Sequence, residues 1–209
     1  MNHHQRHRFF LLLAFFLLNF SFFIPHSAHA GLPDTGQTKC YNAAGTEIAC
    51  SGSGQDGAYS INPMSFTDNG NGTITDNNTG LVWQKCSMGQ NNDASCSGSA
   101  TTHNWYQASG TYDATYNPST ISVCGSLSLA GTGWRLPSKK ELVGIVDYSI
   151  PDPGPSIQQT YFPNTVVSSY YWLSTTYASD SGVAWVVAFR NGSVGGYGKS
   201  KAGYVRCVR

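Results

Sequence analysis

The sequence predicts an α+β fold, built on a mostly antiparallel, twisted sheet with one or two short helices and long loops stapled by disulfides. Three observations predict it. Apolar residues come in short groups separated by Gly, Asn and Ser, which is typical of strands joined by turns. Few segments carry the signals of a helix. All six cysteines follow the first 30 residues, and an even number of cysteines in an exported chain indicates disulfides.

The first 30 residues have the pattern of a secretory signal peptide. Arg6 and Arg8 give a basic start, Phe9–Ile24 is an apolar stretch, and Ala28–Ala30 is a small-x-small cleavage site. The alternative is an uncleaved membrane anchor, because the apolar stretch approaches the roughly 17–25 residues that span a bilayer. The cleavage site favours removal. We therefore expect an exported protein, periplasmic, surface-attached or extracellular, that meets the membrane only through its export signal.

The rest of the chain divides into two parts by composition. Residues 31–61 are a Gly/Ser-rich leader, and residues 62–209 form the folded domain. Charge divides differently: residues 31–132 carry a net charge of −5 and residues 133–209 a net charge of +4. A basic C-terminal half can face an anionic partner, although ordinary solvated charges explain it equally well. An exported and nearly neutral chain does not have the charge pattern of a nucleic-acid-binding protein.

The domain begins with an expected three-strand meander. Strands are predicted at Phe66–Asp68, Thr73–Asp76 and Leu81–Gln84, because Asn-Gly and Thr-Gly turns separate them. The oxygen-rich stretch Asp68–Asp76 could also bind calcium. It lacks the Glu that an EF-hand has at position 12, where Thr79 stands. Hairpin turns are the favoured interpretation, and calcium stays open.

Two helices are expected. Trp105–Ala108 is predicted to form one or two turns that end at Gly110. Ser138 and Glu141 form a capping box, in which each side chain bonds a backbone N–H of the first turn. The helix that Ser138 starts is expected to run to about Asp147.

The C-terminal part contains further strand candidates. They are Tyr170–Ser174, Val183–Phe189, Ser193–Tyr197 and Tyr204–Val208, with Asn191-Gly192 as a hairpin turn.

The cysteines allow fifteen pairings, and the sequence alone does not choose among them. Short loops favour Cys40 with Cys50 and Cys86 with Cys96 as local staples. The remaining pair, Cys124 with Cys207, would then close a long loop. A zinc site is not indicated, because there is no C-x-x-C motif and residues 31–209 contain one histidine, His103.

Four blocks in this order resemble the Lcl C-terminal domain family, named for a Legionella collagen-like surface adhesin. They are Phe66–Gln84, Gly133–Leu142, a looser match at Tyr171–Thr176, and Tyr204–Arg209. The resemblance covers about residues 62–209. It implies a C-type-lectin-like fold, in which terminal strands pair, and an exported bacterial protein at the cell surface. The founding adhesin binds sulfated glycosaminoglycan-type polysaccharides. No collagen-like repeat precedes the domain here, so the resemblance carries over no trimer.

The expected function is therefore a surface or secreted binding module. Its expected ligand is an anionic polysaccharide, such as a sulfated one, or a surface protein, held by aromatic and cationic side chains. Trp172 and Trp185 could instead be core residues, and Trp134 and Arg135 are expected to be structural. The candidate ligand-binding residues are Trp172, Tyr177, Arg190, Tyr197, Lys199 and Lys201.

Other classes of function have less support in the sequence. A subunit of a pilus or outer-membrane complex is the alternative. We expect no enzyme, no catalytic residues, no bound metal and no cofactor. A hydrolase would need two carboxylates to converge, and the spacing of Asp147, Asp152 and Asp180 does not indicate that they do.

Overall fold

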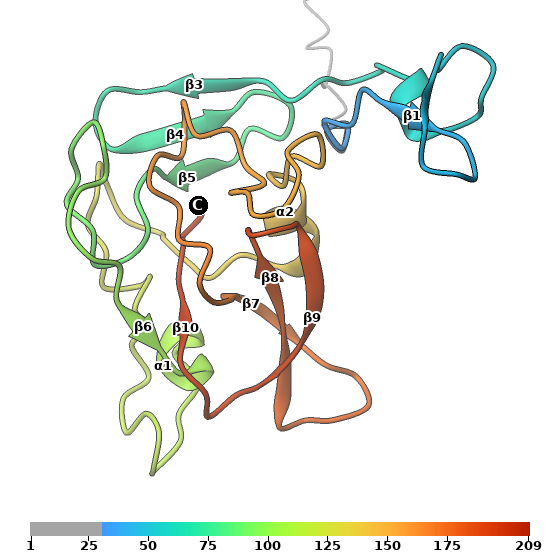
Figure 1. Cartoon of the computed structure of the whole chain (residues 1–209). Helices are drawn as coiled ribbons and strands as arrows, with labels where there is room; N and C mark the ends of the chain where they lie inside the picture. Colours follow the sequence, from blue (N-terminus) through green and yellow to red (C-terminus); the bar gives the residue numbers. More distant parts are fainter. Residues whose placement is uncertain (1–30) are drawn as a thin grey trace, which may run out of the picture.

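The computed structural model describes residues 31–209, so the expected signal peptide at residues 1–30 lies outside the described residues. These residues form three sheets, a 3₁₀ turn and two short helices. Figure 1 shows the meander above the larger sheet, with the strand pair of the leader standing apart at one side. The predicted α+β class, mostly strand with little helix, is confirmed. Within the described residues, no helix is long and apolar enough to cross a membrane.

The three-strand meander forms as the sequence predicts. It consists of β3 (Phe66–Asp68), β4 (Thr73–Asp76) and β5 (Val82–Gln84), paired antiparallel in the order β3-β4-β5. Gly70 and Gly72 in the first turn have positive φ angles of 71° and 83°, which explains the glycines there.

The larger sheet has five strands in the order β6-β10-β7-β8-β9. All neighbouring pairs are antiparallel except β10 with β7, which is parallel. Strand β9 pairs with β8 on one side and is the last strand of the sheet. The bounds are β6 (Thr102–His103), β7 (Tyr171–Thr176), β8 (Val183–Ala188), β9 (Ser193–Gly198) and β10 (Gly203–Tyr204).

The C-terminal tail joins the two sheets. After β10, the Gln84 N–H donates to the Cys207 carbonyl at 2.9 Å, and Val82 and Arg209 exchange bonds of 2.8 and 2.9 Å. On the other side, Arg135 and Val208 exchange two bonds of 2.9 Å. The expected strand Tyr204–Val208 is thus extended throughout, but only its start belongs to the five-stranded sheet.

Both predicted helices exist, and one is shorter than expected. Helix α1 (Trp105–Ser109) starts at a capping box on Asn104 and ends at Gly110, whose φ is 78°. Helix α2 (Lys139–Val143) starts at the predicted Ser138 box. The prediction that α2 runs to Asp147 is wrong. From Gly144 onward the backbone bonds tighten to i→i+3 turns, as between the Val146 N–H and the Val143 carbonyl.

The five-stranded sheet separates two hydrophobic cores, and we name its sides the α2 face and the α1 face after the helices they carry. The core of the α2 face includes Leu142, Tyr171, Leu173, Val187 and Phe189. The core of the α1 face includes Trp105, Trp134, Trp172, Ala184 and Val186. The alternation along β7 and β8 thus sends successive side chains into different cores, as a sheet covered on both faces requires.

All three favoured disulfides are present: Cys40–Cys50, Cys86–Cys96 and Cys124–Cys207. The first closes the leader, which contains β1 (Cys40–Tyr41), β2 (Glu47–Ile48) and a 3₁₀ turn η1 (Asp56–Ala58). The leader is tied to the domain, because the Tyr148 N–H donates to the Thr35 carbonyl at 2.8 Å. The boundaries 31–61 and 62–209 stay predictions.

Candidate functional site

The six candidate ligand residues do not come together in one place. Trp172 and Tyr197 lie on the α1 face, whereas Tyr177 follows β7 and packs against Trp185 of the α2 face. Arg190 lies in the β8–β9 turn, and Lys201 follows the opposite end of β9. The structure therefore offers separate surfaces, which have to be judged one at a time.

Two of the six are buried, which corrects their assignment to a ligand. Trp172 is fully buried, and its indole N–H donates to the His103 carbonyl at 2.8 Å. Lys199 is 7% exposed, so its side chain is not available to a ligand at the surface. Its ammonium lies 3.9 Å from the ring centroid of Trp105 and donates to Thr176 Oγ1 at 3.0 Å. Burial lowers the pKa of Lys199, and the Asp180 carboxylate opposes this in part. Both side chains hold the α1 face together.

A polar hollow of about 280 Å³ lies beside the β8–β9 turn on the α1 face. Arg190 lines it, and its Nε donates to both carboxylate oxygens of Asp152 at 3.1 and 3.2 Å. The Tyr170 ring also lines the hollow and lies 5.0 Å from the ring of Tyr197. The hollow is lined by hydroxyl and amide groups and by one cationic side chain, Arg190, whose charge is partly neutralised by Asp152. The remaining lining residues are Val167, Ser168, Ser169, Ala188, Asn191 and Ser193.

The α2 face carries an aromatic and cationic surface, which we call the α2 shelf: Arg135, Lys139, Lys140, Tyr177 and Trp185. The Lys139 ammonium lies 3.2 Å from the ring centroid of Trp185, and the Tyr177 ring lies 4.7 Å from the same residue. These three side chains are half-buried, and Lys140 is exposed. No acidic side chain within residues 31–209 forms an ion pair with Lys139 or Lys140.

Local structure fixes the cations of the α2 shelf. The Ser138 capping box starts α2 with Lys139 and Lys140 in its first turn. The Lys139 N–H donates to Thr175 Oγ1 at 3.1 Å, and the Ser174 N–H donates to the Pro137 carbonyl at 2.8 Å. These bonds fasten the start of the helix to the end of β7.

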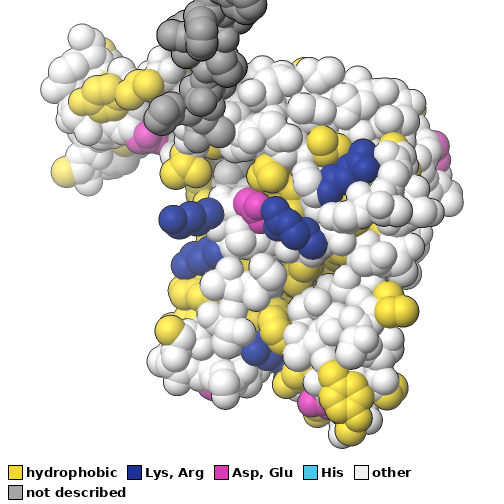
Figure 2. All heavy atoms as spheres, turned by 180° about the vertical axis from the view of Figure 1, so that it is seen from behind, with side chains coloured by type: hydrophobic (Ala, Val, Ile, Leu, Met, Phe, Trp, Pro, Cys, Tyr) yellow, Lys and Arg dark blue, Asp and Glu magenta, His cyan; other side chains and the backbone are white. Residues whose placement is uncertain are grey.

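An ion pair holds the remaining cation. The Arg135 guanidinium binds both oxygens of Glu141, at 2.6 and 2.8 Å. The ion pair with Arg135 lowers the pKa of Glu141 to about 2 and raises that of Arg135. Arg135 therefore pairs with an acid, in line with the structural role expected of it. Figure 2 shows Lys and Arg side chains gathered on one side of the molecule, some of them beside an acidic group.

Glycine in β9 makes room for the rings of the α2 shelf. Gly196 lies opposite Trp185 in the ladder. A methyl group at Gly196 would lie 2.9 Å from Val183 Cγ1 and 3.4 Å from Tyr177 Cδ2. The Val183 and Tyr177 side chains therefore fill the space beside Trp185, and position 196 has room only for glycine.

A comparison with known protein families identifies the family of this chain. A family model described as the Lcl C-terminal domain matches residues 72–209. The chain belongs to the Lcl C-terminal domain family. No curated protein matches it. Membership of the Lcl C-terminal family, together with three disulfides, makes this a secreted or surface domain.

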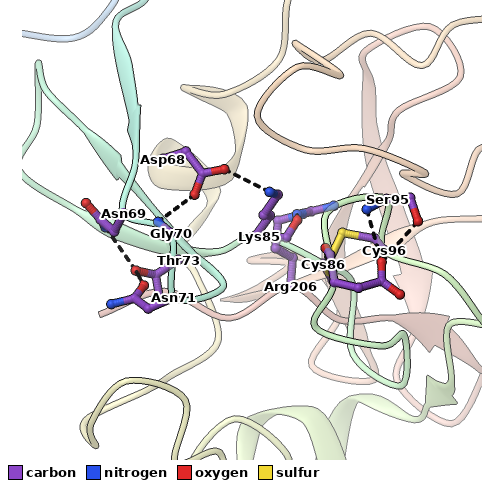
Figure 3. A network of polar contacts seen from close by, with 11 residues as sticks. Asp68, Asn69, Gly70, Asn71, Thr73, Lys85, Cys86, Ser95, Cys96 and Arg206 are labelled. Atoms are coloured by element: carbon purple, nitrogen blue, oxygen red, sulfur yellow. Dashed lines mark hydrogen bonds and ion pairs between the residues drawn. A yellow bond between two sulfur atoms is a disulfide. The ribbon is translucent and has the colours of Figure 1, made fainter.

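The oxygen-rich turn of this Lcl C-terminal domain is occupied by internal contacts, as Figure 3 shows. Asp68 accepts from the Gly70 N–H at 2.9 Å and pairs with Lys85 at 2.8 Å. The hydrogen bond from Lys85 lowers the pKa of Asp68. The Asn69 amide donates to Thr73 Oγ1 at 2.9 Å. These contacts are those of a hairpin turn, and residues 31–209 contain no group of three acidic, His or Cys side chains that could hold a metal.

The three acids considered for hydrolysis serve local roles. Asp147 accepts from the Ser149 hydroxyl at 2.6 Å, Asp152 binds Arg190, and Asp180 accepts from the Gly182 N–H at 2.8 Å. Asp147 and Asp180 therefore support their own loops, and Asp152 links its loop to the β8–β9 turn.

Sequence reasoning missed most of the α2 shelf. It assigned Trp134 and Arg135 a structural role and left Trp185 open between a ligand-binding role and the core. The adjacent Lys139 and Lys140 at a helix start were the available signal. The contact of Lys139 with Trp185 could not be predicted from the sequence, because it joins segments from distant parts of the chain.

Proposed function

We propose that this domain is a surface adhesion module that binds an anionic polysaccharide on the α2 shelf. The observation that carries the proposal is the contact of Lys139 with Trp185, beside Tyr177 and without an acid paired to Lys139 or Lys140 in the described chain. Flat aromatic rings pack on the apolar faces of sugars, and ammonium and guanidinium groups bind sulfate or carboxylate.

The electrostatics of the α2 shelf favour an anion. Lys139 and Lys140 bring two positive charges that no acidic side chain of residues 31–209 pairs with, whereas Arg135 is already paired with Glu141. A polymer with repeated negative charges gains from several such contacts at once.

The proposal includes the C-type-lectin-like fold that family resemblance implies. It is supported by the antiparallel sheets, the long stapled loops and the pairing of the C-terminal tail with β5. We do not propose an enzyme, since each of the acids considered already has a hydrogen-bond partner within residues 31–209.

The test is binding of heparin, used as a sulfated probe, to the mature protein at low salt. We expect Lys139→Ala/Lys140→Ala to weaken binding about tenfold, which is about 1.4 kcal/mol. Alanine forms helices well, so the fold of α2 should persist. The matched control is Lys39→Ala, which removes an exposed lysine of the leader that pairs with Glu47 at 2.8 Å. Absence of wild-type binding at low salt, or an unchanged affinity in the double variant, would refute the proposal.

A second candidate function is a subunit of a surface assembly. The uncovered outer edge of β9 favours it, because such an edge can pair with another chain. Co-purification with a filament, without heparin affinity, would distinguish it from adhesion.

A further inference from the structure

Strand β9 leaves one edge of the five-stranded sheet uncovered. It pairs with β8 along residues 193–198 and with no other strand. Figure 1 shows no strand beyond it. Ser193 and Gly196 are exposed, and the other four strand residues are half-buried.

The bonds to β8 determine which backbone groups point outward. The Lys199 N–H donates to the Gly182 carbonyl at 2.8 Å, so these two residues, opposite each other in the register, form a hydrogen-bonded pair. Such pairs alternate along an antiparallel ladder. Residues 197, 195 and 193 therefore bond β8, and the N–H and C=O groups of Val194, Gly196 and Gly198 face away from it.

These outward groups have few partners. Within residues 31–209, the Gly198 carbonyl accepts from the Lys201 N–H at 2.9 Å, and no comparable bond involves Val194 or Gly196. The strand also lacks the features that usually protect an edge. The segment Ser193–Gly198 contains no charged residue and no proline, and three of its six residues are glycine.

We propose that β9 pairs with β9 of a second copy of this chain, antiparallel about a two-fold axis at Gly196. This register sets Gly196 opposite its own copy and Val194 opposite Gly198 of the other copy. All three outward residues then form hydrogen-bonded pairs, and the two sheets become one.

The side chains of β9 suit this register. Tyr197 of each copy lies opposite Gly195 of the other on the α1 face. A methyl group at Gly195 would have no atom within 4 Å, so this position is open to a neighbouring ring. A ring beside a glycine on the adjacent strand restores the packing that the glycine lacks. No charged side chain of either strand opposes another across the interface.

The pairing would join two α2 shelves, a consequence that rests on the proposed function. Trp185 lies opposite Gly196 on the α2 face, so the two Trp185 residues would flank the axis. Three strand spacings separate them, about 14 Å in total. The Gly196 residues at the axis carry no side chain, and the Tyr177 ring beside each of them adds aromatic surface between the two Trp185 residues. A single extended polysaccharide could therefore contact both copies, which raises its affinity without any new kind of contact.

The experiment measures the mass of the mature protein over a range of concentrations by sedimentation equilibrium, without glycan. It also follows hydrogen exchange of the Val194 and Gly196 amides in the wild-type protein. We expect a reversible dimer and slower exchange of these amides as concentration rises. A monomer at every concentration, with exchange of these amides independent of concentration, would overturn the proposal. The same result is expected if the β9 edge binds a different protein instead of a second copy.

A pair of variants makes the test specific. Val194→Pro removes an outward N–H at an edge position where proline is tolerated, and should abolish the dimer. Val194→Thr keeps that N–H and the shape of the side chain, and should dimerise like the wild type. Unchanged dimerisation of a folded Val194→Pro protein would contradict the register. If the monomeric Val194→Pro protein still binds heparin, the proposed function stands independently of the dimer.

Discussion

Each face of the five-stranded sheet carries a lysine over a tryptophan, and the two pairs have opposite surroundings. On the α1 face, Lys199 is 7% exposed, lies over the buried Trp105 and bonds Thr176. On the α2 face, Lys139 lies over the half-buried Trp185 at the surface. The same pair of residue types thus supports the fold on one face and offers a charge to ligands on the other. Burial, rather than chemistry, makes the difference.

The two faces are also secured differently. The core of the α1 face contains both halves of the Cys124–Cys207 disulfide, which links residues 83 positions apart. The core of the α2 face has no cysteine, and its helix is held by a capping box and the Arg135–Glu141 pair. We therefore expect removal of the disulfide to destabilise mainly the α1 face. Low pH should destabilise mainly the α2 face, because it protonates Glu141.

The largest expected effect is from removing the long disulfide. Cys124→Ser/Cys207→Ser should lower the free energy of unfolding by about 4–5 kcal/mol, because it releases a long loop in the unfolded chain. The matched control, Cys40→Ser/Cys50→Ser, opens a loop of sequence separation 10 and should cost less, about 3 kcal/mol. Urea unfolding measures both. Equal losses would show that the α1 face does not depend on the long closure.

A smaller effect is expected at Lys199. Lys199→Ala should cost about 2 kcal/mol of unfolding free energy, because it removes the buried stem and the cation over Trp105. Lys199→Met keeps the stem without a charge to desolvate, and should cost less. Lys201→Ala, at an exposed position after β9, should stay within about 0.5 kcal/mol of the wild type. Thermal unfolding of the three variants checks this. If Lys199→Ala unfolds at the same temperature as the wild type, Lys199 does not support the fold, and the proposed difference between Lys199 and Lys139 is wrong.

The smallest effect depends on pH. The folded-state pKa of Glu141, about 2, is below its ordinary value of 4.5, so the ionised group stabilises the fold above about pH 4.5. This stabilisation is lost as pH falls through the range from 4.5 to 2. Because the pair with Arg135 is partly exposed, we expect about 1 kcal/mol. Glu141→Gln should therefore be less stable than the wild type at pH 6 and nearly equal at pH 2.5 in urea titrations. A constant difference would assign the effect to capping alone.

Local features of the fold were predictable from sequence because neighbouring residues decide them. The Ser138 capping box, the Gly110 helix end and the Asn-Gly turns of the meander depend on side chains within a few positions. The length of α2 could not be predicted from the sequence. Ile145 and Val146 keep helical spacing, whereas the backbone after Gly144 forms tighter i→i+3 turns. The candidate site was harder still, since four of its six predicted residues lie apart and two are buried.

The sequence by itself determined where strands, turns and caps occur and which cysteines could pair through short loops. The tertiary structure alone decided which lysine meets solvent. Alternation along a strand shows that successive side chains point to opposite faces, but it does not show what covers each face. Trp105 of helix α1 covers Lys199, whereas Lys139 and the Tyr177 ring leave Trp185 half-buried at the surface. Exposure depends on segments far away in the chain, and for that reason function had to be sought on the folded surface.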